Sequence, residues 1–295
     1  VKRNFHVWGY VVKICGEVKF MNHPLIRYHG GKFRLSDWII SHFPPHETYV
    51  EPFGGGASVL LSKVPSGTEI YNDLDTEVVN FFRVLRCETK RIKLIEQLEL
   101  TPYARNEFVE AYGYTDCEIE KARRLVIRAQ MGFGSAGATK GKTGFRATGG
   151  RDKPYESKLW DEYPLRLIQA AKRLKSVYIE NDDALRIIQR YDSTETLFFI
   201  DPPYLCSTRD SGTKAYRHDL TDEQHNQLLD LILSLKGKVI LSGYQSDLYE
   251  LKLKNWKKLT KSTQASGANG GVTREEILWI NPQAENQHDL FSEVV

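Results

Sequence analysis

The tetrapeptide Asp201-Pro202-Pro203-Tyr204 constrains the fold of this chain more than any other stretch. It follows the apolar run 196–200, which has the length and composition of a buried central strand. Two consecutive prolines lack backbone N–H donors and fix φ at about −65°, so the chain must leave the sheet at once in a stiff, extended loop. The strand therefore delivers a carboxylate, rigid carbonyl acceptors and an aromatic ring to its end.

This loop has a structural and a functional interpretation. As structure alone it is a strand followed by a polyproline turn, and one short motif does not decide against that. As a site, the Asp201 carboxylate and the neighbouring carbonyls suit a planar group that carries an exocyclic amino group. The other motifs of the chain decide between the two.

Composition indicates an ordinary globular protein. The 295 residues are 41% hydrophobic, which allows one large α/β domain with an insertion or two modest domains. No stretch approaches the roughly 20 apolar residues of a membrane span, and no signal peptide is visible, so we expect a cytoplasmic protein. The four cysteines and eight histidines form no CxxC or metal-ligand cluster, and we expect neither a disulfide framework nor a metal site.

A glycine-rich turn lies between an expected strand and an expected helix at 48–61, in the order Glu51-Pro-Phe53-Gly54-Gly55-Gly56-Ala-Ser. Glycines there let the backbone approach a ligand closely. The turn is neither a GxGxxG fingerprint nor a Walker A loop. About 20 residues later the second strand ends at Asp73, where nucleotide-type folds hold a ribose. Asp75 is the expected N-cap of a helix that runs to about Leu98, which leaves Asp73 for a ligand.

A second glycine pair, Gly30-Gly31, precedes Lys32 and an amphipathic segment at 33–43. Free N–H groups and an ammonium at a helix start favour an anion site. A glycine turn with a solvated lysine is the alternative.

Basic residues accumulate where the strand rhythm stops. Between residues 121 and 153 there are nine Lys or Arg and one acid, Asp152, within helical patterns and a glycine-rich stretch. Such a surplus attracts a phosphate backbone, whereas the alternative is a solvated loop. We favour DNA binding, with these candidate contacts: Arg128, Lys140, Lys142, Arg146, Arg151 and Lys153.

Strands alternate with helices through the rest of the chain, with strands expected at 177–180, 196–200, 238–244, 256–263 and 274–280. Asp183 is expected to start a helix that runs to Tyr191, and Thr221 one that runs to about Leu235. The pattern predicts an α/β fold with a doubly wound, mainly parallel sheet that has an antiparallel end, its last two strands being joined by a turn at 266–271.

The expected domains follow from these elements. Residues 21–100 and 176–285 form the catalytic and cofactor-binding domain, 101–175 an insertion, and 286–295 a tail. We expect Met21 to be the natural start, so that residues 1–20 are a leader that is not native. The alternative is a genuine leader that packs as an edge strand at 7–12.

The order of the motifs resembles that of a known family: GGK at 30–32, EPFGGGAS at 51–58, ND at 72–73, a basic insertion, and DPPY at 201–204. From about Leu25 to Pro282 the chain resembles the D12 class of N6-adenine-specific DNA methyltransferases, relatives of the DNA adenine methylases in the alpha arrangement. The resemblance implies a seven-stranded sheet of the S-adenosylmethionine-dependent type with a helical, basic target-recognition insertion. Position 28, often Trp in such enzymes, is Tyr here, which keeps a stacking face.

The resemblance also implies roles for individual residues. S-adenosylmethionine would be bound by Tyr28, Lys32, Glu51, Phe53, Gly54, Gly56, Asp73, Asp183 and Asp201. The target base would be held by Asp201, Pro202, Pro203 and Tyr204, with Tyr204 stacked on it. We expect a monomer encoded by a bacterium or phage that acts on double-stranded DNA; the sequence leaves open whether a cognate restriction enzyme exists.

The residue types suit this chemistry. The lone pair of the adenine amino group is delocalised into the ring, so acceptors must hold its hydrogens before the nitrogen can attack a methyl group. A base inside a duplex must also be flipped out. Two other readings remain: transfer to RNA adenine or to a protein glutamine, and a DNA-binding relative without turnover.

Overall fold

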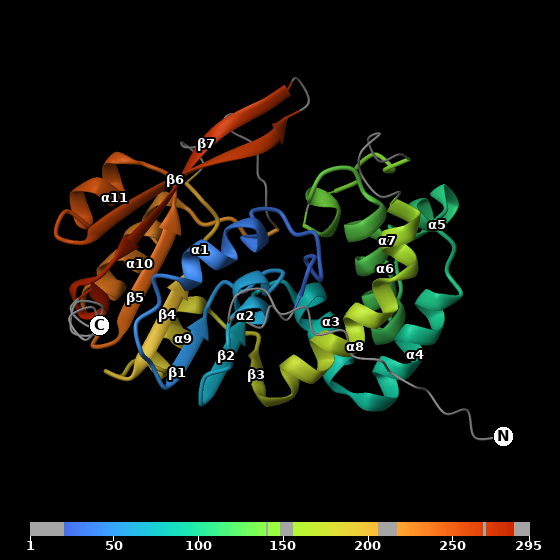
Figure 1. Cartoon of the computed structure of the whole chain (residues 1–295), viewed down its shortest axis with the longest axis horizontal. Coiled ribbons are helices and arrows are strands. Elements are labelled where there is room, and N and C mark those ends of the chain that lie inside the picture. The colour runs from blue at the N-terminus through green and yellow to red at the C-terminus, as the bar shows by residue number, and fades with distance from the viewer. Residues whose placement is uncertain (1–20, 140, 148–155, 206–216, 268–269, 286–295) are drawn as a thin grey trace, which may run out of the picture.

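A single seven-stranded sheet runs in the order β3-β2-β1-β4-β5-β7-β6 (Figure 1). The structure, a computed structural model, describes residues 21–139, 141–147, 156–205, 217–267 and 270–285. Strand β7 is antiparallel to both of its neighbours, and the other pairings are parallel. This confirms the predicted fold class. The strands are β1 (Thr48–Glu51), β2 (Thr68–Asn72), β3 (Val177–Glu180), β4 (Thr196–Ile200), β5 (Lys238–Gly243), β6 (Lys257–Gly267) and β7 (Gly270–Ile280).

Helices precede and connect the strands. Those of the first part of the chain are η1 (Phe33–Leu35), α1 (Ser36–Ile40), α2 (Ser58–Ser62), α3 (Thr76–Arg86), α4 (Glu88–Glu99), α5 (Arg105–Glu110), α6 (Glu118–Met131) and η2 (Ala136–Ala138). The later ones are α7 (Glu156–Asp161), α8 (Tyr163–Arg173), η3 (Leu174–Ser176), α9 (Ala184–Arg190), α10 (Asp222–Leu233) and α11 (Asp247–Lys252).

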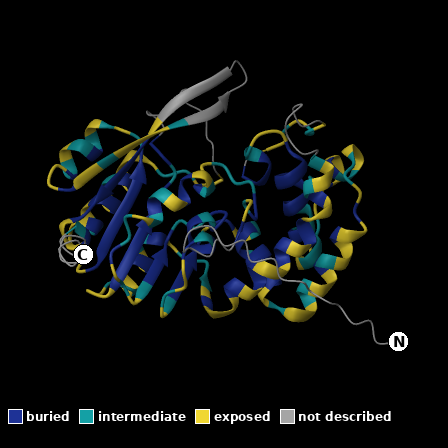
Figure 2. Cartoon of the chain, in the orientation of Figure 1, coloured by how far each residue is buried: buried dark blue, intermediate teal, exposed yellow. Residues whose placement is uncertain are grey.

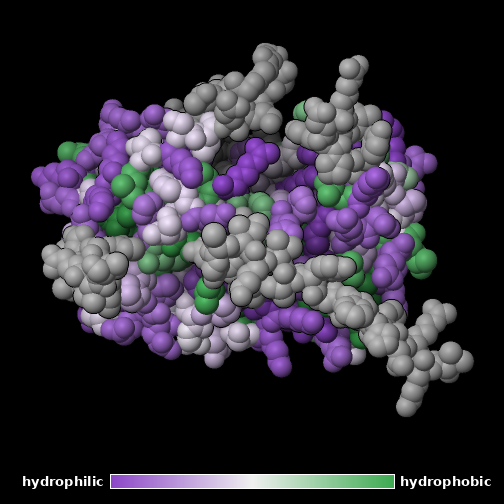
Figure 3. Space-filling view, viewed as in Figure 1, coloured by the Kyte–Doolittle hydropathy of each residue, from purple (hydrophilic) through white to green (hydrophobic). Residues whose placement is uncertain are grey.

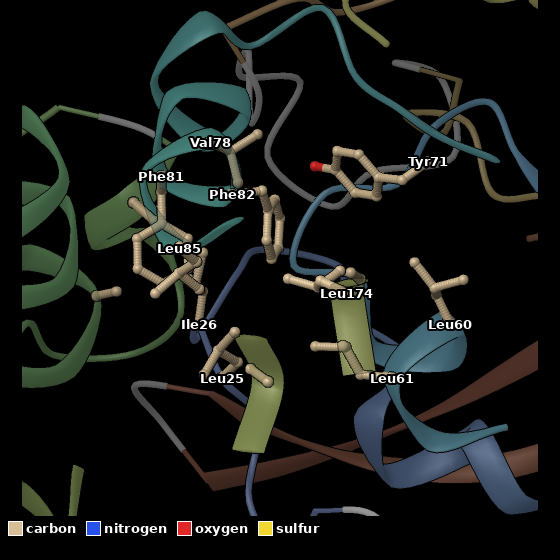
Figure 4. Close-up of a cluster of buried hydrophobic side chains, with 14 of the residues drawn as sticks. Leu25, Ile26, Leu60, Leu61, Tyr71, Val78, Phe81, Phe82, Leu85 and Leu174 are labelled. Atoms are coloured by element: carbon tan, nitrogen blue, oxygen red, sulfur yellow. The ribbon is translucent and has the colours of Figure 1, made fainter. Parts of the chain in front are cut away.

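The two faces of the sheet bury two separate hydrophobic clusters, because successive side chains of a strand point to opposite faces. Tyr49 of β1 belongs to the cluster under α1, α2, α3 and α8, whereas the next residue, Val50, belongs to the cluster under α9, α10 and α11. Figure 2 shows the strands buried between these layers. Figure 4 shows part of the first cluster, where α3 contributes Phe81, Phe82 and Leu85. Burial on both faces explains why the central strands are continuous apolar runs.

The predicted helix from Asp75 to Leu98 is wrong in its extent, because it is two helices. Asp75 is the N-cap, as predicted, and its side chain accepts a hydrogen bond from the Glu77 N–H. The helix stops at Cys87, which has an extended backbone with φ −82° and ψ 115° and also starts α4. The break lets α4 turn and bury Leu94 and Leu98. No glycine or proline marks this position, so the sequence carried no signal for it.

The last two strands are longer than predicted. Strands β6 and β7 pair from Lys257↔Ile280 to Gly267↔Gly270, so the expected turn at 266–271 is largely strand. In Figure 1 this hairpin extends beyond the rest of the sheet.

Among the described residues between β2 and β3, the regular elements are the helices α3 to α8 and η2 to η3. Helix α6 packs against α3 and α4, and Figure 1 shows α4 to α8 grouped beyond the β3 edge of the sheet. Its helix α8 also packs on α3 and α4. The predicted insertion thus shares its core with the sheet domain.

The surface of the described residues is largely polar. Figure 3 shows hydrophilic side chains over much of one face, with hydrophobic ones in small groups among them. None of the helices in the described ranges combines the length and apolar composition that crossing a bilayer requires. The expected leader at 1–20, with its alternative strand at 7–12, and the tail at 286–295 lie outside the described residues.

Candidate functional site

A cavity of about 490 Å³ lies at the carboxyl ends of β1, β2 and β4. The strand order reverses between β1 and β4, and such a switch point leaves a crevice in which doubly wound sheets bind ligands. Glu51 ends β1 and Asp201 follows β4, so the two carboxylates flank the switch point. The volume is within the range of roughly 300–1,000 Å³ for small-molecule sites. Of the predicted cofactor residues, those that line the cavity are Tyr28, Lys32, Glu51, Phe53, Gly54, Gly56, Asp73 and Asp201.

The glycine turn is packed too tightly to hold side chains. A Cβ on Gly54 would lie 2.2 Å from the Tyr71 ring, and Gly55 has a φ of 47° and faces the Tyr28 ring. The Tyr71 hydroxyl donates to the Gly55 carbonyl over 2.7 Å. The turn is thus pressed onto β2, which keeps its backbone at the wall of the cavity.

Asp73 fixes the turn as well as lining the cavity. Its two carboxylate oxygens accept the N–H groups of Gly55 and Asp75, each over 2.8 Å. Burial raises the pKa of Asp73 to about 6, against the opposing effect of these two donors. The sequence predicted that Asp73 is available to a ligand. The carboxylate also has a structural role, and it keeps lone pairs for a hydroxyl group.

Glu51 is 3% exposed at the end of β1. Its Oε1 accepts the Tyr49 hydroxyl over 2.6 Å and the Leu60 N–H over 2.7 Å. Burial raises the pKa of Glu51 to about 7, although these two hydrogen bonds and Lys63 favour the carboxylate. A carboxyl that titrates near neutrality in a cavity is typical of a functional site.

Lys32, which is buried, and Asp201, which is half-buried, form an ion pair. The Lys32 Nζ lies 2.8 Å from each Asp201 oxygen and donates to the Gly30 carbonyl over 2.9 Å. Lys32 is 5% exposed, so the predicted alternative of a solvated lysine is wrong. Burial raises the pKa of Asp201, and the Lys32 ammonium opposes that shift. The GGK segment and the DPPY loop, 169 residues apart in sequence, therefore meet at one carboxylate.

Tyr204 does not present its ring to the cavity. It is 8% exposed, its hydroxyl donates to Glu276 over 2.8 Å, and its ring packs edge-on against Tyr244. The same hydroxyl lies 3.3 Å from Asp201 Oδ1. Pro203 lines the cavity, whereas Tyr204 and Pro202 do not. Stacking on a base, as predicted for Tyr204, requires the side chain to move from this position.

Asp183 lies beside the cavity without lining it. It is exposed at the start of α9, where it accepts the N–H groups of Leu185 and Arg186. This confirms the helix cap that we predicted for it. The next residue, Ala184, does line the cavity.

Two of the predicted DNA contacts are committed to partners within the protein. Arg128 is 7% exposed, pairs with Glu77 and donates to the Ala111 carbonyl over 3.0 Å. Arg146 pairs with Glu156 and donates to the carbonyls of Gly132 and Gly134. Arg128 is therefore withdrawn as a DNA contact. The count of charges between 121 and 153 was misleading because the acids that pair with these arginines lie outside that window.

Of the other basic candidates, the structure describes one. Lys142 is exposed, whereas Lys140, Arg151 and Lys153 lie outside the described residues. Within the described ranges, no group of three or more His, Cys, Asp or Glu side chains is placed to share a metal ion.

Sequence reasoning missed part of the cavity wall. Leu74 and Asp75 line it after β2, and the segment 217–221 and the start of α10 line it from the other part of the chain. Arg217 joins these two walls, because its guanidinium contacts Asp75 Oδ1 over 3.1 Å and Glu77 Oε2 over 2.7 Å. No motif marks Arg217, and only the fold brings it to residues 142 positions away.

The fold and the site define a class of protein. A seven-stranded sheet with an antiparallel last strand, a glycine turn after β1, and acids at the ends of β1, β2 and β4 are those of an S-adenosylmethionine-dependent methyltransferase. The family model for D12 class N6 adenine-specific DNA methyltransferases matches residues 28–267. The chain belongs to this family, whose members methylate adenine in DNA at N6, and membership implies S-adenosylmethionine as the methyl donor.

Two relatives share low sequence identity with this chain, but their alignments cover most of both proteins. The chain is 25% identical over 255 residues to the type II methyltransferase M.MjaIII of Methanocaldococcus jannaschii, a match that covers 77% of this chain and 86% of that protein. It is 21% identical over 268 residues to the DNA adenine methylase of Salmonella typhi, covering 87% and 93%. A shorter match, 34% identical over 89 residues, covers 30% of this chain and 13% of the modification methylase StsI of Streptococcus sanguinis.

Proposed function

We propose that the cavity at the switch point holds S-adenosylmethionine and that the DPPY loop holds the target adenine beside it. The observation that carries this proposal is the Lys32–Asp201 pair on one side of the switch point, with Glu51 on the other, around a cavity of about 490 Å³. The carboxylates supply acceptors for the amino and hydroxyl groups of such a cofactor. The glycine turn, whose Gly54 has no room for a Cβ, provides a bare backbone wall.

In this proposal, different residues bind different groups of the cofactor. Glu51 accepts from the methionyl amino group, Asp73 from a ribose hydroxyl, and the Tyr28 ring and Phe53 supply apolar contact. When bound, the cofactor supplies an electrophilic methyl group whose departure leaves a neutral thioether. Asp183 is an outer residue of this site, because it caps α9 behind the cavity wall.

The target amino group is held by Asp201 and by the carbonyl of Pro202. Acceptors on both hydrogens localise the lone pair on N6 and orient it. Asp201 remains ionised for this purpose because Lys32 offsets the cost of burying its charge. After methyl transfer, the excess proton on N6 leaves to an Asp201 oxygen and then to water. Tyr204 rotates away from Glu276 to stack on the base, and Pro203 keeps the loop stiff.

Double-stranded DNA is the partner, and the helical segment 101–175 contacts it through Lys142 and the basic residues Lys140, Arg151 and Lys153. The enzyme acts as a monomer in the cytoplasm of a bacterial cell, host or phage-infected.

Transfer to DNA is tested by incubating the protein with methyl-labelled S-adenosylmethionine and with duplex DNA, RNA or protein as acceptor. We expect label on DNA, recovered after digestion as N6-methyladenine. Label on RNA or protein alone would contradict the proposal. Label on none of the three acceptors, with intact DNA binding, would favour a relative without turnover.

The role of Asp201 is tested by Asp201→Ala. We expect transfer to fall by at least about 100-fold, because positioning of the nitrogen carries the catalysis, while DNA binding changes little. Asp247→Ala, which removes an exposed acid from the first turn of α11, is the matched control and should retain full transfer. Near-normal transfer by Asp201→Ala would refute the assignment.

A further inference from the structure

Tyr49 lies below the cavity, in the middle of β1, and does not line it. Its side chain is fully buried and its hydroxyl donates to Oε1 of Glu51, two residues along the strand, over 2.6 Å. Both residues point to the same face of β1, because side chains alternate along a strand. The Leu60 N–H, in α2, donates to the same oxygen over 2.7 Å. Both protein donors therefore occupy Oε1.

The second oxygen of Glu51 has a different environment. Among the described residues no donor contacts Oε2, and Glu51 lines the cavity. Oε2 is not among the fully buried polar atoms that lack a partner, so it is open to the cavity, where a ligand or water can donate to it. The hydrogen bonds on Oε1 fix the carboxyl group from below and leave Oε2 as its acceptor for a ligand.

Tyr49 is itself held by a buried ionic cluster. Lys63 Nζ lies 4.5 Å from the centre of the Tyr49 ring and 2.7 Å from Glu69 Oε1, and Glu69 also pairs with Arg173. These side chains are each less than 10% exposed. This packing holds the Tyr49 ring in one orientation, so its hydroxyl is preorganised to donate to Glu51 Oε1.

We infer that Tyr49 is a positioning residue for cofactor binding: its hydroxyl holds Glu51 Oε1 so that Oε2 faces the cavity as an ionised acceptor for the methionyl amino group. The inference rests on the proposed function, since it deepens the role of Glu51 there. Tyr49 touches no substrate and acts only through Glu51.

The charged groups around Glu51 give this arrangement a pH dependence. Lys63 favours the carboxylate from below, whereas Asp201 across the switch point opposes it, and Lys32 lies on the far side of Asp201. Burial and the neighbouring Glu51 hold the pKa of Tyr49 well above its usual range, so the phenol stays a donor at every pH of interest. Loss of this donor raises the pKa of Glu51 further, so a larger fraction of the carboxyl group is protonated at neutral pH.

The test is Tyr49→Phe, which keeps the buried ring and removes only the hydroxyl. We expect the dissociation constant for S-adenosylmethionine to rise about tenfold at pH 7, with kcat at saturating cofactor nearly unchanged. A cationic amino group needs the carboxylate, so the deficit should be largest at acidic pH and narrow as the pH rises to about 9. A general structural defect would instead weaken binding equally at all pH values.

The control is Tyr163→Phe, which removes another fully buried hydroxyl, a donor to the Leu25 carbonyl over 2.7 Å. We expect it to lower stability without shifting the pH profile of cofactor binding. A Tyr49→Phe profile that is parallel to wild type would overturn the inference.

The variant Glu51→Gln distinguishes an error in the role of Tyr49 from an error in the proposed cofactor site. If Glu51→Gln binds S-adenosylmethionine normally, the proposed cofactor site is wrong and the inference falls with it. If Glu51→Gln loses the cofactor while Tyr49→Phe retains the wild-type profile, only the role of Tyr49 is overturned.

Discussion

At the scale of single residues, the site is built from carboxylates whose charge is controlled by neighbours. Asp201 lies in a place where burial alone favours the neutral acid, and Lys32, with its Nζ 2.8 Å from each oxygen, restores the ionised form. In the proposed site Lys32 therefore acts on the acceptor of the target base in addition to lining the cavity. The pair also contacts the Tyr204 ring, which lies 4.9 Å from the ammonium.

Replacement of this lysine is predicted to move the acid limit of the reaction. In Lys32→Met the carboxylate loses its cation, so the pKa of Asp201 rises further and the acid limb of kcat shifts to higher pH. Activity lost at pH 7 should partly return at higher pH. The measurement is kcat against pH at saturating cofactor and DNA, with Lys32→Arg as the variant that keeps the charge. An unshifted acid limb in Lys32→Met would show that Asp201 does not depend on this partner.

At the scale of elements, the turn between β1 and α2 is held in place by packing and hydrogen bonds from β2 and the residue Asp73 that follows it. Tyr71 is fully buried, packs beside Gly54 and donates to Gly55, while Asp73 holds the Gly55 N–H from the end of the same strand. Ala57 then starts α2 in the left-handed region, with φ 54°, which is unusual for a residue other than glycine. The turn is thus a rigid product of two adjacent strands.

The substitution Gly54→Ala tests this packing. Its Cβ would lie 2.2 Å from the Tyr71 ring, so either the ring or the turn must shift. We expect a loss of about 1–3 kcal/mol in the free energy of unfolding, as for other overpacked cores. We also expect at least about tenfold weaker cofactor binding. Gly141→Ala, at a position with no atom within 4 Å of the added Cβ, is the control for both measurements. Equal behaviour of the two variants would mean that the turn is adaptable.

At the scale of the whole molecule, the order β3-β2-β1-β4-β5-β7-β6 gathers residues from three parts of the chain at one crevice. The helical segment 101–175 is fixed to this sheet by α6 against α3, and the Arg128–Glu77 pair ties the two helices together. Glu77 also binds Arg217 from the wall of the cavity. One carboxylate thus connects the segment that we propose to bind DNA with the wall of the cavity.

DNA binding by this segment is tested by replacing Lys140 and Lys142 together with alanine. If both contact phosphates, binding weakens and the slope of log K against log salt falls by about 2, at roughly 0.9 per contact. Lys172→Ala with Lys175→Ala, two exposed lysines at the end of α8 and in η3, is the matched control. Arg146→Ala should instead lower stability, because Arg146 bridges Glu156 and the carbonyls of Gly132 and Gly134. If the Lys140 and Lys142 double variant has the same salt slope as wild type, these two lysines are solvated and do not contact DNA.

The sequence by itself determined the α/β class, the caps at Asp75, Asp183 and Thr221, and the carboxylates and glycines that follow the strands at the crevice. These features rest on local physics: apolar runs, glycine and proline restrictions, and side chains that bond their own backbone. Carboxyl ends of parallel strands meet at one edge, so motifs that follow strands gather there without further information.

Only the tertiary structure decided which charged side chains pair within the protein and which line the cavity. The pairing of Arg128 with Glu77, the contact of Tyr204 with Glu276 and the Arg217 contacts join residues 51 to 142 positions apart. The break at Cys87 likewise depends on what α4 packs against. Ion pairs and helix ends of this kind depend on burial and proximity, which no count within a window of sequence contains.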